Sequence, residues 1–182
     1  MIDRVRARYE ASSGIEARFE QVTTLFDESD RLTGRIWLQG EKYRLEAGTR
    51  TVVADGVTVW VFDRAENQVI ISDFVEDETT FSITGFLYRF EERWKVTGEA
   101  ASVQGGERVR IATVVPIDPD DWFSRVTVTV RERDALVTRL EVVDASDITM
   151  IFDLQGVVER PLEPGLFRFT PEAGVEVVDL RS

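Results

Sequence analysis

Apolar and polar residues alternate with a period of two along most of the chain, which is the pattern of half-buried β-strands. Near the start, Ile15, Ala17 and Phe19 alternate with charged residues. About ten strands joined by short turns predict one large antiparallel sheet, and a sheet of that size tends to curl. Apart from the first run, alternating or strand-like apolar segments occur at 32–38, 42–46, 52–54, 57–62, 68–71, 108–115, 126–131, 136–143, 148–154 and 175–180.

One of these strands is apolar on both faces. Trp60 and Phe62 point to one side, whereas Val59 and Val61 point to the other. The Asp55-Gly56 pair just before them is a strong signal for a tight turn. Two large aromatic side chains on one face predict that this face lines a cavity for an apolar guest.

Two segments depart from the period of two. In residues 2–12, apolar side chains recur at spacings of three and four, which predicts a short amphipathic helix. Residues 78–92 place large apolar side chains near helical spacing, with Thr79 or Thr80 in position to cap the helix. Gly85 weakens this segment by roughly 1 kcal/mol relative to alanine. We expect both segments to cover the concave side of the sheet.

Size and composition indicate a single globular domain that spans residues 1–182. Hydrophobic residues make up 43% of the chain and charged residues 31%, which is typical of a folded protein rather than a disordered one. The longest apolar runs are shorter than the eighteen residues that a membrane-spanning helix needs. The net charge of −12 disfavours nucleic acid and anionic membranes as partners. Either a high-salt host or a GC-rich genome explains the acidity and the scarcity of lysine.

The sequence contains little that would support catalysis. Cysteine and histidine are both absent, which excludes thiol nucleophiles, disulfides, histidine-based metal sites and Ser-His-Asp triads. Two acidic clusters, at 27–30 and 118–121, could hold Ca²⁺, but acidic residues and proline also favour turns. We favour turns, and we expect no catalytic residue, no metal and no cofactor.

The aromatic residues carry more information about function. A curved sheet that is covered by only two or three short helices has difficulty filling its concave side. The unfilled part would be an apolar groove, the usual character of a ligand pocket. Alternation groups the side chains within each strand but leaves open which face is concave. The residues predicted to line the cavity or to belong to the lid are Trp37, Tyr43, Trp60, Phe62, Phe86, Leu87, Phe90, Met150 and Phe152.

Several motifs, in order along the chain, resemble those of the LolA-type outer-membrane lipoprotein carrier family. The resemblance implies a mainly β (α+β) fold, an unclosed, strongly curved half-barrel with short helices that form a lid over a hydrophobic cavity. It implies a non-enzymatic, cofactor-free periplasmic protein that carries lipoprotein acyl chains from an inner-membrane ABC exporter to an outer-membrane receptor. We expect a monomer whose signal peptide has been removed. The matching pieces are ARFEQ (17–21), LTGRIWL (32–38), KYR (42–44), VADGVTVWVFD (53–63) and LFRFTPEAGVEV (166–177).

The sequence departs from the family pattern in the lid. Members often carry an Arg-Pro pair whose arginine helps to latch the lid, whereas this chain has Gln39-Gly40. The cargo therefore stays open, and the protein could instead carry a different envelope lipid. Three rival functions also stay open. They are a LolB-type receptor, which needs a lipidated N-terminal cysteine, an RseB-type envelope sensor, which usually has a further domain, and an enzyme built on a sheet.

Overall fold

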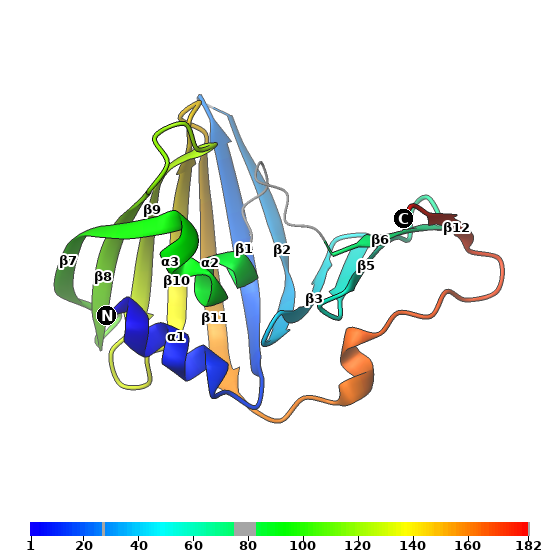
Figure 1. Ribbon diagram of the computed structural model, residues 1–182, viewed down its shortest axis with the longest axis horizontal. Helices are drawn as coiled ribbons and strands as arrows, with labels where there is room; N and C mark the ends of the chain where they lie inside the picture. Colours follow the sequence, from blue (N-terminus) through cyan, green and yellow to red (C-terminus); the bar gives the residue numbers. More distant parts are fainter. Residues whose placement is uncertain (27, 75–82, 182) are drawn as a thin grey trace.

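The computed structural model describes residues 1–26, 28–74 and 83–181, and twelve strands in this part of the chain form one sheet. The sheet is unclosed and strongly curved, which confirms the predicted fold class (Figure 1). The strands are β1 (Ile15–Leu25), β2 (Glu28–Gln39), β3 (Lys42–Ala47), β4 (Arg50–Ala54), β5 (Thr58–Asp63), β6 (Gln68–Asp73), β7 (Trp94–Gln104), β8 (Glu107–Pro116), β9 (Phe123–Arg131), β10 (Val137–Asp144), β11 (Thr149–Glu159) and β12 (Glu176–Asp179).

The strand order is β12-β6-β5-β4-β3-β2-β1-β11-β10-β9-β8-β7. Two antiparallel meanders, β1–β6 and β7–β11, are therefore joined where β1 pairs with β11. The last strand, β12, adds to β6 in parallel, so the expectation of a purely antiparallel meander was wrong at this edge. The sequence pattern also missed β7, which is exposed along almost its whole length and has no apolar alternation.

Helices cover one face of the sheet, in front of the strands from β8 to β1 (Figure 1). They are α1 (Ile2–Glu10), α2 (Ile83–Tyr88) and α3 (Phe90–Arg93), and a short 3-10 helix, η1 (Pro164–Phe167), lies near the C-terminus. The helix predicted at 2–12 is confirmed. The segment predicted at 78–92 forms two helices from residue 83 onward, and its expected start at Thr79 or Thr80 lies outside the described residues.

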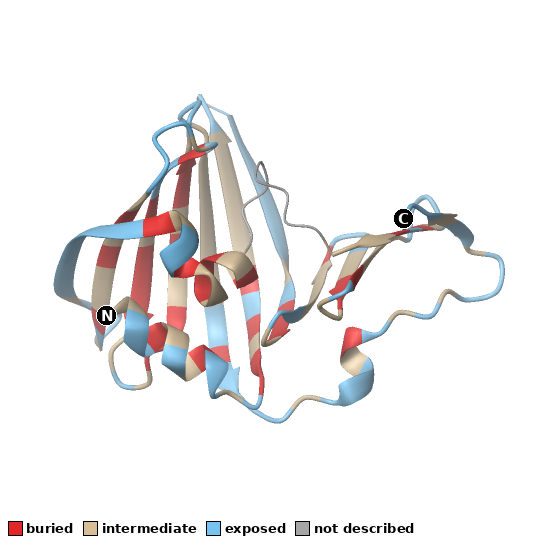
Figure 2. Ribbon diagram, in the orientation of Figure 1, coloured by how far each residue is buried: buried red, intermediate tan, exposed pale blue. Residues whose placement is uncertain are grey.

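The sheet has an inner face, which the helices cover, and an outer face opposite to it. Directly paired residues on neighbouring strands point to the same face, so the register assigns every side chain. Ala17 pairs with Ile36 on the inner face, whereas Glu16 pairs with Trp37 on the outer face. The main hydrophobic core lies between the helices and the inner faces of β1, β2 and β8–β11 (Figure 2).

A second apolar layer lies on the outer face of β2–β6. There the chain after β11, which we call the strap (residues 160–175), crosses the sheet on its way to β12. The Arg44 guanidinium donates to the Leu166 carbonyl at 3.4 Å, and the Phe62 and Phe169 rings lie 5.3 Å apart. The strap therefore covers the face that Trp60 and Phe62 share, which explains why β5 is apolar on both sides.

Candidate ligand-binding hollow

The inner face forms a hollow that the helices close from one side. Its lining is apolar and comes from α1, α2 and four strands, β1, β2, β10 and β11. In this conformation the remaining cavity measures about 10 Å³, room for about one water molecule. The protein's own side chains thus fill the hollow in this conformation, so the expectation that the concave side stays unfilled was wrong beneath the helices. Its lining residues are Tyr9, Ile15, Ala17, Ile36, Leu38, Ile83, Leu87, Val137, Leu140, Leu154 and Val157.

The side chains of α2 and α3 fill the space that an apolar guest would need. Phe86 and Leu87 are only 3% and 4% exposed. The Phe86 ring meets Phe90 edge-on at 5.6 Å and Trp94 at 5.8 Å, and Trp94 continues the cluster to Phe123. Such aromatic contacts add about 0.5–1.5 kcal/mol each beyond the burial of area. The space beneath these helices is therefore occupied in this conformation.

Beyond the helices the inner face continues as an aliphatic strip. Ile36, Leu45, Val52, Val61 and Ile70 pair in succession from β2 to β6, so they form one row across five strands. Four strand spacings of about 4.8 Å make this row about 19 Å long. Burial decreases along it, from 5% exposure at one end to 36% at the other. Of the described helices, none lies over the strip on β3–β6 (Figure 1).

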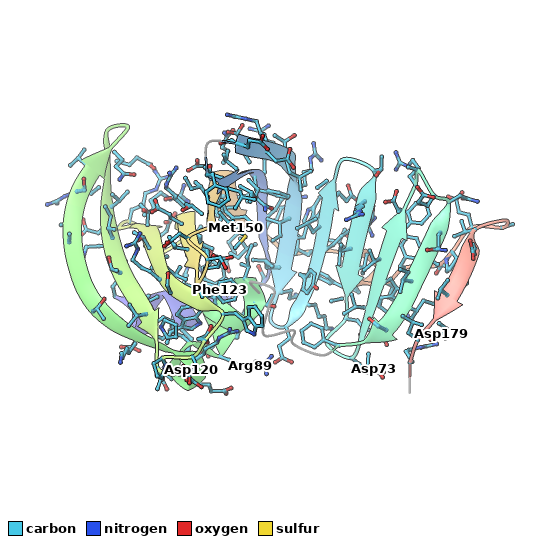
Figure 3. All side chains as sticks on the ribbon, turned by 90° about the horizontal axis from the view of Figure 1, so that it is seen from above. Asp73, Arg89, Asp120, Phe123, Met150 and Asp179 are labelled. Carbon is cyan, nitrogen blue, oxygen red and sulfur yellow. The ribbon has the colours of Figure 1, made fainter. Side chains whose placement is uncertain are left out.

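Near the end of β1 and the start of β11, the inner face combines polar and apolar side chains. Met150 and Phe152 on β11 are half-buried and pack against the core. Their partners on β1 are Thr23 and Gln21, which are also half-buried. Figure 3 looks down on this end of the curved sheet and marks Met150. This part of the hollow thus offers both apolar contact and hydrogen-bonding groups.

The structure divides the predicted lining residues between the two faces. Tyr43, Met150 and Phe152 lie on the inner face and pack against the core. Burial raises the pKa of the Tyr43 hydroxyl, which therefore stays neutral at physiological pH. The three predicted residues on the helices, Phe86, Leu87 and Phe90, are buried in the same core.

Three predicted residues lie on the other side. Trp37, Trp60 and Phe62 belong to the outer face, so their predicted place in the helix-covered cavity was wrong. The physical reason is that a period of two fixes which side chains share a face, whereas the cover on each face decides which one is concave. The same register adds Leu45, Val52, Val61 and Ile70 to the inner face, and their alternation was visible in the sequence.

Two hydrogen bonds and an ion pair hold α1 against the sheet beside the hollow. Tyr9 is fully buried, and its hydroxyl accepts from the Val137 N–H at 3.2 Å. Arg8 forms an ion pair with Glu159 at the end of β11 and also donates to the Asp134 carbonyl at 3.2 Å. This helix is therefore tied to both β10 and β11.

Other contacts hold α2 and α3. The Arg93 guanidinium donates to both carboxylate oxygens of Asp121, at 2.6 and 2.7 Å, which ties α3 to the loop between β8 and β9. The Tyr88 hydroxyl lies 3.5 Å from the Tyr9 carbonyl. Burial raises the pKa of Tyr88, against an opposing effect of a hydrogen bond with the Gly40 backbone. Tyr88 thus contacts the turn that carries Gln39-Gly40 in place of the family's Arg-Pro pair.

The same turn is linked to the end of α1. Gln39 donates from its side-chain amide to the Ser13 carbonyl at 2.8 Å. Gln39 and Gly40 therefore connect β2 with the chain after α1 and with α2. Gly40 thus contacts α2, and Gln39 contacts the segment between α1 and β1.

The described residues give no support to a metal or membrane-spanning role. Within them, three or more His, Cys, Asp or Glu side chains nowhere gather closely enough to hold a metal ion. Every helix in this part of the chain is too short or too polar to cross a membrane. The acidic residues 118–121 form a turn in which Asp121 binds Arg93. The other predicted acidic turn includes residue 27, which lies outside the described part.

Comparison with known proteins identifies the family. The model of the outer membrane lipoprotein carrier protein LolA matches residues 10–170 of this chain. The chain belongs to the LolA family. The resemblance inferred from the motifs is therefore confirmed, and the match covers the strands that line the hollow, α2, α3 and most of the strap, whereas α1, apart from its last residue, precedes it.

Individual LolA relatives are distant but extend over most of the chain. An outer-membrane lipoprotein carrier protein of Xanthomonas campestris is 28% identical over 91% of this chain and 81% of its own length. That of Alkalilimnicola ehrlichii is 26% identical over 94% of this chain and 80% of its own length. A crystal structure of an uncharacterized conserved protein from Thermus thermophilus has the same fold, with a TM-score of 0.66 at 15% identity; the match covers 98% of this chain and 96% of that one.

Proposed function

We propose that the protein is a periplasmic carrier that binds the acyl chains of lipoproteins and shuttles them from the inner to the outer membrane. It would receive its cargo from an inner-membrane ABC exporter, deliver it to an outer-membrane receptor and act as a monomer of one domain. The observation that carries the proposal is the apolar inner face, which α2 side chains fill at one end and which none of the described helices covers along the aliphatic strip. Membership of the LolA family supports it.

The energetics explain why such a carrier is needed. Each methylene group of an acyl chain gains about 0.8 kcal/mol on leaving water, so a sixteen-carbon chain gains on the order of 10 kcal/mol. The aliphatic strip offers a surface of matching chemistry. When α2 moves away, the hollow beneath Phe86 and Leu87 adds to it. On return, these two side chains refill the hollow and favour release of the guest.

The lining is thus proposed to consist of inner-face residues only. Tyr43, Met150 and Phe152 belong to it, together with the strip. Phe86, Leu87 and Phe90, on α2 and α3, occupy the space beneath the helices and leave it when the helices move. The carboxylate clusters have no part in it, and the mechanism needs no catalytic residue and no cofactor.

A charge placed on the strip tests the binding site. Ile70→Asp puts a carboxylate on the inner face, where an acyl chain would have to strip it of water. We expect uptake of a fluorescent acyl probe to fall about tenfold or more. The matched control is Val177→Asp, because Val177 is half-exposed on β12 but points to the outer face. Equal loss in both variants, or in neither, would contradict the proposed lining.

Transport is tested separately from binding. The purified protein is added to spheroplasts, and release of a lipoprotein into the supernatant is measured by immunoblotting. A carrier releases lipoprotein, and Ile70→Asp releases less. Binding of the acyl probe without any release would favour a sensor or a carrier of another lipid over the proposed shuttle.

A further inference from the structure

Polarity changes along the inner face of β1. Ile15, Ala17 and Phe19 are 2%, 2% and 5% exposed and belong to the core. The next two inner positions, Gln21 and Thr23, are polar and half-buried. From Phe19 to Thr23 the strand rises about 14 Å. A guest that lies along β1 would therefore meet hydrocarbon first and hydrogen-bonding groups further up.

The Gln21 side chain lies between apolar neighbours. In the register, Leu32 on β2 pairs with it on one side and Phe152 on β11 on the other. Thr23 lies beside Met150. The cross-strand neighbours of Gln21 thus offer its amide no hydrogen-bonding side chain. A purely packing role would be served by leucine or methionine at the same position.

Gln21 and Thr23 have hydrogen-bonding groups left over that a ligand can use. The Gln21 amide nitrogen donates to the Thr23 hydroxyl oxygen at 3.1 Å. Among the residues that the structure describes, the Gln21 carbonyl oxygen accepts no hydrogen bond, and the second amide hydrogen has no acceptor. Thr23 keeps its hydroxyl proton to donate. The pair can therefore both donate and accept, which matches the carbonyl of an ester and the C=O and N–H of an amide.

The charges nearby favour a neutral polar group. Asp30 on β2 pairs with Thr23, and the chain as a whole carries a net charge of −12. Both disfavour a free carboxylate at this level. A fatty acid anion is therefore a poorer match than an ester or an amide.

We propose that Gln21 and Thr23 form a polar subsite that recognises the ester or amide linkage of an acylated guest by hydrogen bonds. The hydrocarbon lies toward Phe19 and Leu154, and the linkage sits beside the Gln21 amide. This inference rests on the proposed carrier function and adds its specificity: acyl chains in ester or amide linkage bind in preference to plain hydrocarbon and to free fatty acid.

The test compares guests of one chain length that differ only at the head. A fatty acid methyl ester, the free fatty acid and the alkane each displace a fluorescent acyl probe from the protein. We expect the wild type to bind the ester about five- to tenfold more tightly than the alkane, because one or two net hydrogen bonds are gained. Gln21→Leu should reduce this ratio to about one without weakening alkane binding.

Two further variants sharpen the result. Thr23→Val should lower the ester-to-alkane ratio while keeping shape and volume. Gln155→Leu is the matched control, because Gln155 is an exposed glutamine on the outer face of β11, and it should leave the ratio unchanged. Thermal unfolding of each variant checks that the fold is retained.

The outcomes separate this inference from the carrier proposal. If neither the ester nor the alkane displaces the probe from the protein, the carrier function fails. If both bind but the ratio is the same in the wild type and Gln21→Leu, the polar subsite is wrong while the carrier stands. Preference for the free fatty acid would also overturn the subsite.

Discussion

At the scale of single residues, the Tyr9 hydroxyl decides how α1 is held against the sheet. It is buried and accepts from the Val137 N–H. Tyr9→Phe keeps the ring but leaves that buried N–H without a partner, which costs about 1–3 kcal/mol. We expect the free energy of unfolding, measured in urea, to fall by this amount. The control is Tyr88→Phe, whose hydroxyl contacts the Tyr9 carbonyl at 3.5 Å and the Gly40 backbone but is only half-buried, so that water can replace it as a partner. Equal losses in both variants would contradict the role given to Tyr9.

Residues also show where prediction from sequence ends. The pairing of Trp60 with Phe62 on one face and of Val59 with Val61 on the other follows from alternation alone, and the structure confirms it. Which face is inner depends on the strap and the helices, which lie far away in the sequence. The strap has turn residues and no regular period, so its cover over Trp60 could not be predicted.

At the scale of elements, a partly buried ion pair ties α3 to the loop between β8 and β9. The Asp121 side chain is 7% exposed, and Arg93 meets it with two hydrogen bonds. The Arg93 guanidinium also lies 5.6 Å from the Trp94 ring and 5.2 Å from the Phe123 ring. Asp121→Asn keeps the size but removes the charge. We expect it to lower the free energy of unfolding at neutral pH by about 1–3 kcal/mol.

The pH dependence of this ion pair has a definite sign. Burial alone would raise the pKa of Asp121, but hydrogen bonds from Arg93 and the Phe123 N–H outweigh it, so the pKa is lowered. A carboxyl group whose folded-state pKa is depressed stabilises the fold above its unfolded pKa and loses that effect as pH falls through the folded value. The wild type should therefore lose its advantage over Asp121→Asn as pH falls below the ordinary aspartate pKa of about 3.9. A constant difference down to pH 2, measured by urea unfolding, would contradict this assignment.

Element boundaries were predicted unevenly. Strands with strong alternation, such as β1, β2 and β11, were found, whereas β7 was missed because an edge strand exposed on both faces shows no apolar period. The helix at 2–12 was found from its spacing, and the two helices of the lid were read as one because their apolar residues continue across the break at Arg89.

At the scale of the whole molecule, the sheet has two covers, helices over the inner face near β1 and the strap over the outer face of β2–β6. The two covers stabilise different halves. Beneath the strap, Val53 and Val69 are fully buried although neither belongs to the core under the helices. None of the described helices covers the inner face of β3–β6, whereas the strap covers its outer face. The strap thus supports the part of the sheet that the helices leave open.

Removing the strap should therefore loosen one half of the sheet. Deletion of residues 160–182 uncovers the outer side chains of β2–β6 and removes Phe167, which is 2% exposed, so the loss of that ring alone costs about 3–5 kcal/mol. We expect hydrogen exchange to show faster amide exchange in β3–β6, with protection in β8–β10 retained. Deletion of residues 176–182, which removes only β12, should affect mainly its neighbour β6. If the longer deletion raised exchange equally in both halves, the sheet would behave as one cooperative unit. The open inner strip would then depend on the helices as much as on the strap.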